Sequence, residues 1–192
     1  MQDAPSFKQF KKLIEDYIRG QFTLIEAYAL NRFGVDGHIQ CEVSFANSRK
    51  TSKGGIKKNG QMYVSILGNK WLRYAYNDWK VDIVSDNHHY NEYAGFRTSE
   101  KIGEFNGYWT IGIVAILCHE IAHAIQFNRT HGSGASIDSG YESARIYATD
   151  NKIHAKHGLD WQYIYQILRD EFVNPYIGDT TKYIPPKIES VM

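Results

Sequence analysis

An uncharged apolar run, Ile111 to Cys118, leads directly into two histidines and a glutamate that are spaced at the pitch of an α-helix. The run predicts a buried helix that continues through the pentapeptide HEIAH at 119–123. Positions four apart lie one turn apart on one face of a helix, so the His119 and His123 imidazoles can reach the same cation. Glu120 is offset by about 100° around the helix axis, and its carboxylate therefore lies beside that cation rather than on it. The fold must bury a helix that carries these polar side chains.

The HExxH pattern is typical of zinc peptidases, in which the two histidines bind the metal and the glutamate acts on a metal-activated water. The alternative is a solvated helix end that carries two histidines by chance. The apolar run argues against it, because a core helix rarely carries two His and one Glu within a turn unless each has a partner. A metzincin would need another histidine six residues after His123, where Arg129 stands. We therefore predict His119 and His123 as ligands of one zinc ion and Glu120 as the general base.

The composition indicates one domain with a single core over residues 1–192. The chain is 43% hydrophobic and has a formal net charge of +1, so no global charge marks a nucleic-acid or membrane protein. Cys41 and Cys118 lack the CxxC spacing of a zinc ribbon, and nothing indicates a disulfide framework. The first twenty residues contain no apolar signal segment, and no uninterrupted apolar run is long enough to cross a bilayer. We expect an intracellular, cytoplasmic protein with no membrane partner.

The periodicity of apolar residues predicts an α+β fold with helices at both ends and a small antiparallel sheet between them. The N-terminal helices at 6–34 are predicted as two, because Gly20 ends the first and a Thr23-to-Glu26 capping box opens the second. Alternating residues at 39–45 predict a half-buried strand. The polar, glycine-containing segment 47–60 is predicted as a loop, 61–67 as the returning strand, and 80–85 and 93–96 as short strands.

The second half of the chain is predicted to be helical around the HExxH helix, for which Asn106 is a plausible N-cap. The Gly/Ser-rich segment 130–140 is predicted as a loop, followed by a helix to about residue 156 that a Ser139-to-Glu142 capping box opens. Asp160 is expected to cap a last helix before a C-terminal tail at 174–192. The core-facing residues of that helix are Trp161, Ile164, Tyr165, Leu168, Phe172 and Val173.

A catalytic zinc usually has three protein ligands and one position open to water, so a third ligand must come from elsewhere in the chain. The downstream candidates are His131, Glu142, His154 and His157. His131 falls in the predicted loop, where an exposed histidine is the simpler explanation. Glu142 resembles the carboxylate that gluzincins supply from a following helix, but it also fits as the capping partner of Ser139. His154 and His157 are three apart and can lie near one helical face, so the residues alone leave the third ligand open.

The segments HEIAHAIQ at 119–126 and HGLDWQYIYQILR at 157–169 resemble the SprT-like metalloprotease family, which includes the Spartan proteases. In that family a downstream His-Gly-x-x-aromatic element, which opens the next helix, supplies the third ligand. The resemblance implies a zincin-like metalloprotease core over about 38–173. It further implies that the zinc ligands are His119, His123 and His157 and that the base is Glu120. Upstream, Gly54-Gly55 and the strand at 62–67 look like the glycine-bearing hairpin that precedes the family's metal helix.

Two features depart from the family pattern. The gap between His123 and His157 is longer than the compact spacing expected, which implies an inserted helix over about 140–156. The zinc ribbon that many family members carry is absent, since the chain has only two cysteines. With His157 as ligand, His154 becomes a neighbour of the site or a surface residue.

Together these observations predict a zinc metalloprotease that acts on protein substrates, including proteins associated with nucleic acid. One alternative is a gluzincin-like peptidase with Glu142 as third ligand. The other is a binding protein whose zinc is structural and takes part in no catalysis. The glutamate at position 120 favours the enzyme, because a structural zinc site needs no base beside its ligands.

A basic cluster in the predicted 47–60 loop is the candidate for contact with DNA or RNA. Its members are Arg49, Lys50, Lys53, Lys57 and Lys58. Five cations in ten residues can steer a surface toward a phosphate backbone, although such a loop is also typical of a solvated hairpin tip.

Two other groups are assigned no catalytic role. Trp71, Trp79, Trp109 and Trp161 are expected in the core, and Trp161 can also shape the metal site because it follows His157 by four residues. His88-His89 lies in a polar, turn-like stretch, where a solvent-exposed loop is expected rather than a second metal site.

Overall fold

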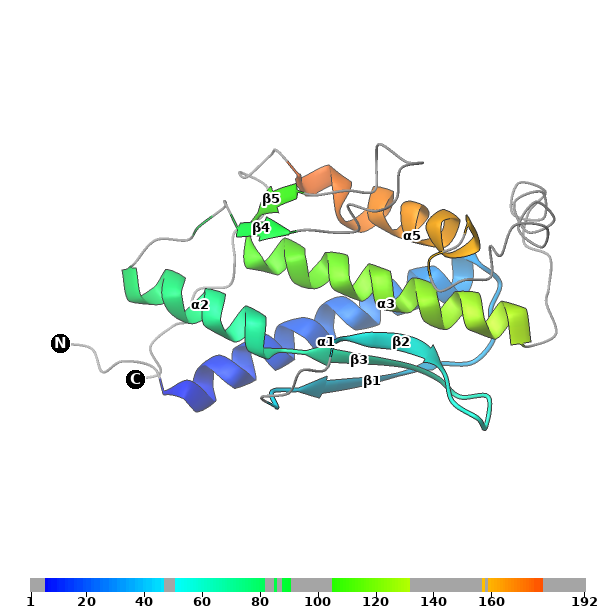
Figure 1. The fold of residues 1–192 in the computed structure, drawn as a ribbon, viewed down its shortest axis with the longest axis horizontal. Coiled ribbons are helices and arrows are strands. Elements are labelled where there is room, and N and C mark those ends of the chain that lie inside the picture. The colour runs from blue at the N-terminus through cyan, green and yellow to red at the C-terminus, as the bar shows by residue number, and fades with distance from the viewer. Residues whose placement is uncertain are drawn as a thin grey trace.

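A central helix, α3 (Trp109–His131), organises the molecule, with the other elements packed around it in the arrangement of Figure 1. The computed structural model describes residues 6–46, 51–81, 85, 88–90, 105–131, 157 and 159–177. Within this part of the chain, helix α1 (Phe7–Arg32) and a small mixed sheet lie on one side of α3, and α5 (Leu159–Phe172) lies on the other. The α+β class predicted from the sequence is confirmed.

Helix α3 is buried on nearly every side, as the apolar run predicts. Its core residues include Ile113, Leu117 and Ile121, each fully buried, and Cys118 is likewise buried, with its thiol donating to the Leu168 carbonyl at 3.7 Å. The stretch Trp109–Arg129 is long and apolar enough to cross a membrane by length and composition, although no uninterrupted apolar run in it reaches that length. Because most of it is enclosed by α1, α5 and the sheet, it serves here as the core helix of the fold.

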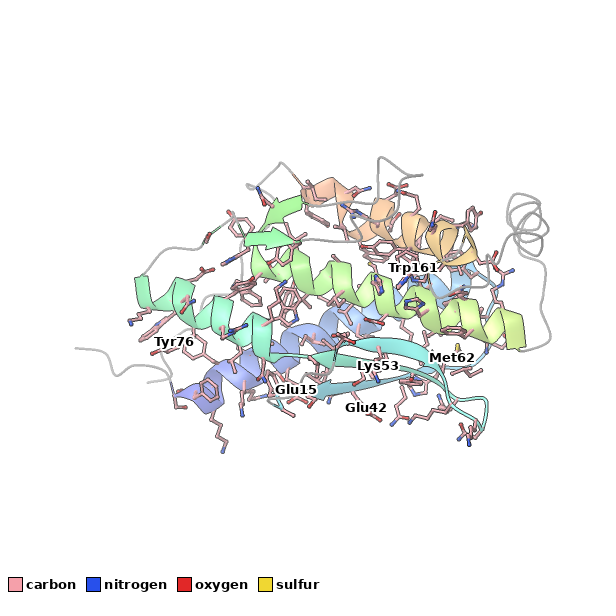
Figure 2. The ribbon with its side chains drawn as sticks, in the orientation of Figure 1. Glu15, Glu42, Lys53, Met62, Tyr76 and Trp161 are labelled. Carbon is pink, nitrogen blue, oxygen red and sulfur yellow. The ribbon has the colours of Figure 1, made fainter. Side chains whose placement is uncertain are left out.

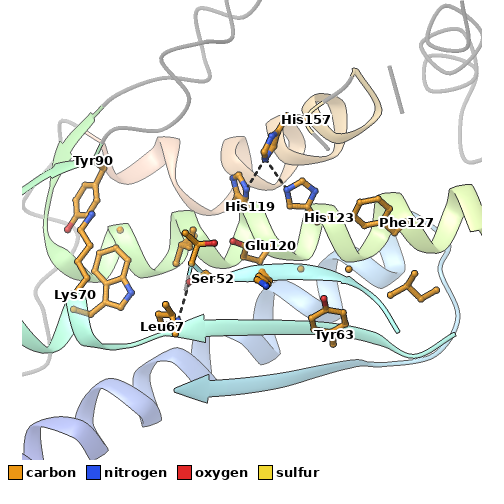
Figure 3. Close-up of a pocket in the computed structure, with 18 residues that line it drawn as sticks. Ser52, Tyr63, Leu67, Lys70, Tyr90, His119, Glu120, His123, Phe127 and His157 are labelled. Atoms are coloured by element: carbon orange, nitrogen blue, oxygen red, sulfur yellow. Dashed lines mark hydrogen bonds between the residues drawn. The ribbon is translucent and has the colours of Figure 1, made fainter. Parts of the chain in front are cut away.

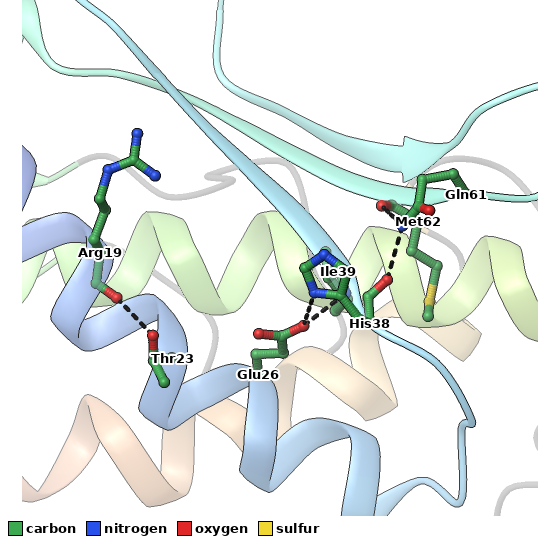
Figure 4. A network of polar contacts seen from close by, with 7 residues as sticks. All are labelled: Arg19, Thr23, Glu26, His38, Ile39, Gln61 and Met62. Atoms are coloured by element: carbon green, nitrogen blue, oxygen red, sulfur yellow. Dashed lines mark hydrogen bonds and ion pairs between the residues drawn. The ribbon is translucent and has the colours of Figure 1, made fainter.

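Helix α1 is one continuous helix, so the prediction of two helices broken at Gly20 is wrong. Ser6 caps its start through a capping box with Gln9, and apolar residues at every third or fourth position face the core. Thr23 opens no new helix; its hydroxyl donates to the Arg19 carbonyl one turn earlier, at 3.1 Å (Figure 4). Glu26 is also not a cap, because its carboxylate accepts the Ile39 backbone N–H at 2.6 Å and fixes the chain that enters the sheet.

The main sheet has the order β1-β3-β2, with β1 (Ile39–Ser44), β2 (Lys53–Ile56) and β3 (Met62–Leu67). Strands β1 and β3 are parallel, with Ile39 opposite Met62, whereas β2 and β3 are antiparallel. The predicted strands at 39–45 and 61–67 exist, but the all-antiparallel sheet is wrong. The chain crosses over between β1 and β2, and the hairpin joins β2 to β3 instead of joining β1 to β3.

Strand β2 lies inside the segment predicted as a loop, and its two glycines explain the error. Gly54 and Gly55 weaken any strand pattern in the sequence, yet a Cβ atom on Gly54 would overlap the backbone of Glu120 on α3. Glycine in a strand often marks such a close approach of two backbones. The β2–β3 turn is closed by the Lys57 N–H, which donates to the Gln61 carbonyl at 2.8 Å, and by Gly60 with φ of +85°.

Helix α2 (Asn69–Val81) follows β3 directly and was not predicted. It occupies the first residues of the strand expected at 80–85; the structure describes only Ser85 of the rest of that segment. Trp71 is buried in the core, as are Trp109 and Trp161. Trp79 is 36% exposed and packs against the rings of Phe10 and Tyr76, so its prediction as a core residue is wrong.

A two-stranded antiparallel sheet, β4 (His88–Tyr90) with β5 (Phe105–Gly107), covers the first turn of α3. Asn106 belongs to β5 and is not the N-cap; the Tyr108 carbonyl accepts the first N–H groups of α3. The strand expected at 93–96 lies outside the described residues. So do most of the loop expected at 130–140 and the helix expected at 140–156.

Helix α5 presents the predicted stripe to the core, where Trp161, Tyr165 and Leu168 are fully buried. Figure 2 shows Trp161 between α5 and α3. The helix begins at Leu159, so Asp160 lies inside its first turn and is not its cap. The predicted tail opens with a short 3₁₀ helix, η1 (Asn174–Tyr176), and its residues beyond 177 lie outside the described part.

Candidate metal centre

Three imidazoles meet on the face of α3 that α5 covers (Figure 3). His119 and His123 project from consecutive turns of α3, and His157 lies two residues before α5 begins. Nε2 of His157 is 3.0 Å from Nε2 of His123 and 3.3 Å from Nε2 of His119. The structure therefore brings together the three histidines that the resemblance implies as ligands, although 38 positions separate the first from the last.

The spacing of the three nitrogens fits a small cation better than it fits hydrogen bonds. A tetrahedral zinc with Zn–N bonds of about 2.0–2.1 Å separates neighbouring ligand nitrogens by about 3.3 Å. The separations of 3.0 and 3.3 Å lie close to that value. A neutral imidazole carries one N–H, so a single proton on His157 Nε2 cannot serve both neighbours. One cation can accept a lone pair from each of the three nitrogens.

The ring of Trp161 forms the floor under the three imidazoles. Its centre lies 4.6 Å from that of His119, 5.3 Å from that of His123 and 4.7 Å from that of His157. Its indole N–H donates to the His119 carbonyl at 3.2 Å, and Gln162 donates to the His157 carbonyl at 3.0 Å. Residues of α5 thus fix the backbone on both sides of the centre, and they hold the imidazoles at the distances that a metal needs.

Glu120 points from α3 toward β2, whereas the imidazoles lie on the side of α3 that faces α5 (Figure 3). Its side chain is buried, and burial raises the pKa of its carboxyl group to about 8, while a hydrogen bond from the Gly54 backbone N–H opposes that rise. Burial, together with the neighbouring His123 and His157, lowers the pKa of His119 well below its ordinary value. His119 is therefore neutral at pH 7, which is the form that binds a metal.

The centre opens into a cleft of about 840 Å³ between α3 and β2. One end of the cleft is apolar and aromatic, where Tyr63, Phe127 and Ile56 line it. The other end is lined by Lys70 and Tyr90, and the imidazoles and Glu120 lie between the two ends (Figure 3). A peptide bound in an extended conformation along β2 would therefore pass the metal centre, with residues on one side of the centre in the aromatic end of the cleft and residues on the other side near Lys70.

Of the four candidate third ligands, His157 is the one whose side chain the structure describes. Glu142 and His154 lie outside the described residues, and His131 is the last residue of α3, with a side chain that is not described. The prediction for His88 is wrong, because it belongs to β4, stacks on Tyr74 with ring centres 4.2 Å apart and lies 3.3 Å from the Asp78 carboxylate. These contacts give His88 a structural role away from the cleft.

The basic cluster is described in part. Arg49 and Lys50 lie outside the described residues, whereas Lys53, Lys57 and Lys58 are exposed. Lys57 donates to the Gln40 side chain at 2.7 Å and lies near the β2–β3 turn, but Lys53 belongs to β2 and lines the cleft itself. The cluster is therefore not confined to a hairpin tip, since one of its members borders the metal centre.

Sequence reasoning missed several residues of the cleft. Gly54 had a recognisable signal, because two adjacent glycines beside an alternating segment indicate a close backbone approach as well as a loop. No sequence signal indicated Lys70, Tyr90 or Phe127, since each reaches the cleft only through the packing of α2, β4 and α3.

A scan against protein-family models matches no family, and searches of curated proteins and of solved structures find no similar protein. The interpretation of the site therefore depends on its own geometry.

Proposed function

We propose that this chain is a zinc metallopeptidase with a zincin-like, SprT-like core. The observation that carries the proposal is the convergence of His119, His123 and His157 on one point. Glu120 lies beside them, on an adjacent face of α3. Three neutral imidazoles are the donor set of many catalytic zinc sites, which keep a fourth position open to water. A structural site would have no use for a buried carboxylate that faces the open cleft.

The residues of the chain divide the work of peptide hydrolysis between them. His119, His123 and His157 would hold a zinc ion, which would supply Lewis acidity toward a water molecule and a peptide carbonyl. Glu120 takes the proton from the attacking water and passes it to the leaving nitrogen. The Gly54 N–H holds the carboxylate of Glu120 toward the cleft. Trp161 and Gln162 keep the backbone of His119 and His157 in place.

The position of β2 supports an extended polypeptide as substrate. Within the described part of the chain β3 is the one strand that pairs with β2, so the other edge of β2 has no strand partner and lies along the cleft. An extended peptide can add to such an edge by main-chain hydrogen bonds, which require no particular side chains. Lys53 on the same strand supports the further proposal that some substrates are bound to DNA or RNA.

Metal analysis combined with a digestion assay tests the proposal. The purified chain should bind one zinc per molecule and degrade an unfolded protein such as casein. A chelator should stop the digestion and added zinc should restore it. Glu120→Gln should retain zinc and lose at least about a hundredfold in rate, because the general base is removed while the ligands stay. A zinc-loaded wild type without hydrolysis, or a Glu120→Gln variant with full hydrolysis, would reject the peptidase.

A further inference from the structure

The two ends of the cleft differ in charge as well as in shape. At one end Gly55 lies between the rings of Tyr63 and Phe127, with 3.6 Å from a hypothetical Cβ atom to each ring. At the other end Lys70 reaches up beside the Tyr90 ring, as Figure 3 shows. Among the described residues that line the cleft, Glu120 is the one carboxylate, and Lys53 and Lys70 are the cations. With a divalent metal in place, the cleft is therefore positive overall.

Lys70 is held at its end of the cleft by three aromatic rings. Its ammonium nitrogen lies 5.0 Å from the centre of the Tyr90 ring, 5.1 Å from that of Trp71 and 5.7 Å from that of Tyr74. A cation over aromatic faces is attracted to them. The rings thus restrict a flexible side chain to one region and reduce the entropy lost when it binds a partner.

The aromatic support of Lys70 is itself built into the fold. Gly112 on α3 lets the two rings pack against the helix, because a Cβ atom there would overlap Tyr90 and come within 2.7 Å of Trp71. Tyr90 is buried, and its hydroxyl donates to the Tyr108 carbonyl at 3.2 Å, which fixes the ring. The support therefore depends on three separate elements, α2, β4 and α3.

The start of α2 adds to the positive potential at this end. Lys70 and Trp71 lie in the first turn of α2, and that turn contains no acidic residue. The N-terminus of a helix carries a partial positive charge and N–H groups without partners inside the helix. A carboxylate that enters this end of the cleft meets an ammonium group and the positive end of a helix together.

We propose that Lys70 is a specificity-determining residue that binds a carboxylate of the substrate, so that the cleft prefers acidic peptides. The inference builds on the proposed peptidase function, since it names the chemistry of the substrate for the same cleft. The carboxylate can come from an Asp or Glu side chain or from the C-terminus of a peptide, and the two sources share the same ion pair with Lys70.

A binding experiment separates this inference from the hydrolysis itself. Zinc-loaded Glu120→Gln protein is titrated with C-terminally amidated peptides that have no other charged side chain. A single Glu, or a Gln in the matched peptide, is placed at successive positions along the sequence. The best Glu peptide should bind about tenfold more tightly than its Gln counterpart, and the ratio should fall toward one at high salt. A second arm uses the Gln peptides with a free C-terminus, and identifies which source of the carboxylate is recognised.

The Lys70 variants are compared by the same ratio, which does not depend on the fraction of folded protein. Lys70→Met in the Glu120→Gln background should reduce the Glu-to-Gln ratio to about one, and Lys70→Arg should keep most of it. Lys80→Met, at the exposed far end of α2, is the control and should keep the full ratio. A Lys70→Met ratio equal to that of the parent would overturn the inference.

The remaining outcomes separate the two proposals. If the wild type cleaves Glu and Gln peptides at equal rates and both bind equally, the peptidase stands and the role of Lys70 is wrong. If no peptide is cleaved but Glu peptides bind through Lys70, the role of Lys70 stands and the peptidase is wrong. Absence of measurable binding of every carboxylate peptide at millimolar concentration also overturns the inference.

Discussion

The two long helices of this protein, α1 and α3, differ in how deeply their polar side chains are buried. On α1 the buried positions form one stripe, and charged residues on its exposed face form ion pairs, such as that of Arg19 with Glu15 at 2.8 Å. On α3 nearly every position is buried, and the polar side chains His119, Glu120 and His123 are buried with the apolar ones. A charged pair on the surface of α1 contributes little to stability, whereas a buried carboxylate or imidazole on α3 costs free energy unless it has a partner. In the proposed function, a metal ion is the partner of the two imidazoles.

The largest expected effect concerns the third imidazole beside α3. His157→Ala should weaken zinc binding by more than about a hundredfold, because changes to groups that only support metal ligands already cost 10–100-fold. Competition with a chromophoric chelator measures the affinity. His38→Ala, an exposed histidine 3.1 Å from Glu26 of α1, is the control and should leave the affinity unchanged. Unchanged affinity in His157→Ala would show that His157 is not a ligand of the zinc ion.

A smaller effect is expected where β2 presses on α3. Gly54→Ala should lower the free energy of unfolding by about 3 kcal/mol, because its methyl group would overlap the backbone of Glu120 and force the strand away from the helix. Denaturant unfolding of the metal-free protein measures the loss. A change below about 0.5 kcal/mol would mean that β2 is not seated on α3 in solution.

The buried carboxylate of α3 should also make stability depend on pH in the metal-free protein. Its pKa is raised to about 8 in the folded state, so the folded protein holds a proton that the unfolded chain releases. Stability from this group is present below its ordinary pKa of about 4.5 and is lost as pH rises through 8. The free energy of unfolding of Glu120→Gln should therefore rise relative to that of the wild type by about 2 kcal/mol between about pH 6.5 and pH 9.

Thermal unfolding with a chelator at several pH values measures this gap. Protonation of buried His119 destabilises both proteins at low pH and cancels in the comparison. Glu15→Gln on the exposed face of α1 is the matched control. A gap that stays constant with pH would show that Glu120 is not buried as a carboxylic acid.

The smallest expected effect lies on α1. Gly20→Ala should raise the free energy of unfolding by about 0.5–1 kcal/mol, because glycine is a poor helix former and a Cβ atom at position 20 meets nothing within 4 Å. Chemical denaturation measures the gain. Destabilisation by this substitution would mean that α1 does break at Gly20, as its sequence first indicates.

Errors in predicting the fold follow from local patterns that tertiary contacts override. Gly20 and the Thr23-to-Glu26 pattern imitate a helix boundary, but packing of Ile18, Phe22 and Ile25 against the core holds the helix together across them. The parallel pairing of β1 with β3 had no local signal, because strand order is decided by the crossover to β2. The α+β class and the strands 39–45 and 61–67 were predictable, since their apolar alternation is long enough.

In the candidate site, too, residues close in sequence were predictable and contacts between distant elements were not. Helical spacing alone predicted that His119, Glu120 and His123 share one helix, and α3 contains all three. The proximity of His157 was expected through a resemblance, because no spacing rule links residues so far apart. Lys70 and Tyr90 could not be predicted, since their meeting requires Gly112 to make room for aromatic rings from two other elements.

Trp161 gives the centre an optical reporter of its own. The indole lies within 4.6–5.3 Å of all three imidazoles, measured between ring centres, and its environment is fully buried. A paramagnetic ion such as Cu²⁺ or Co²⁺ in contact with those imidazoles would quench its fluorescence, whereas diamagnetic Zn²⁺ would not. Emission of this one chromophore, isolated by changing the other three tryptophans to phenylalanine, would follow metal exchange in real time without an added dye.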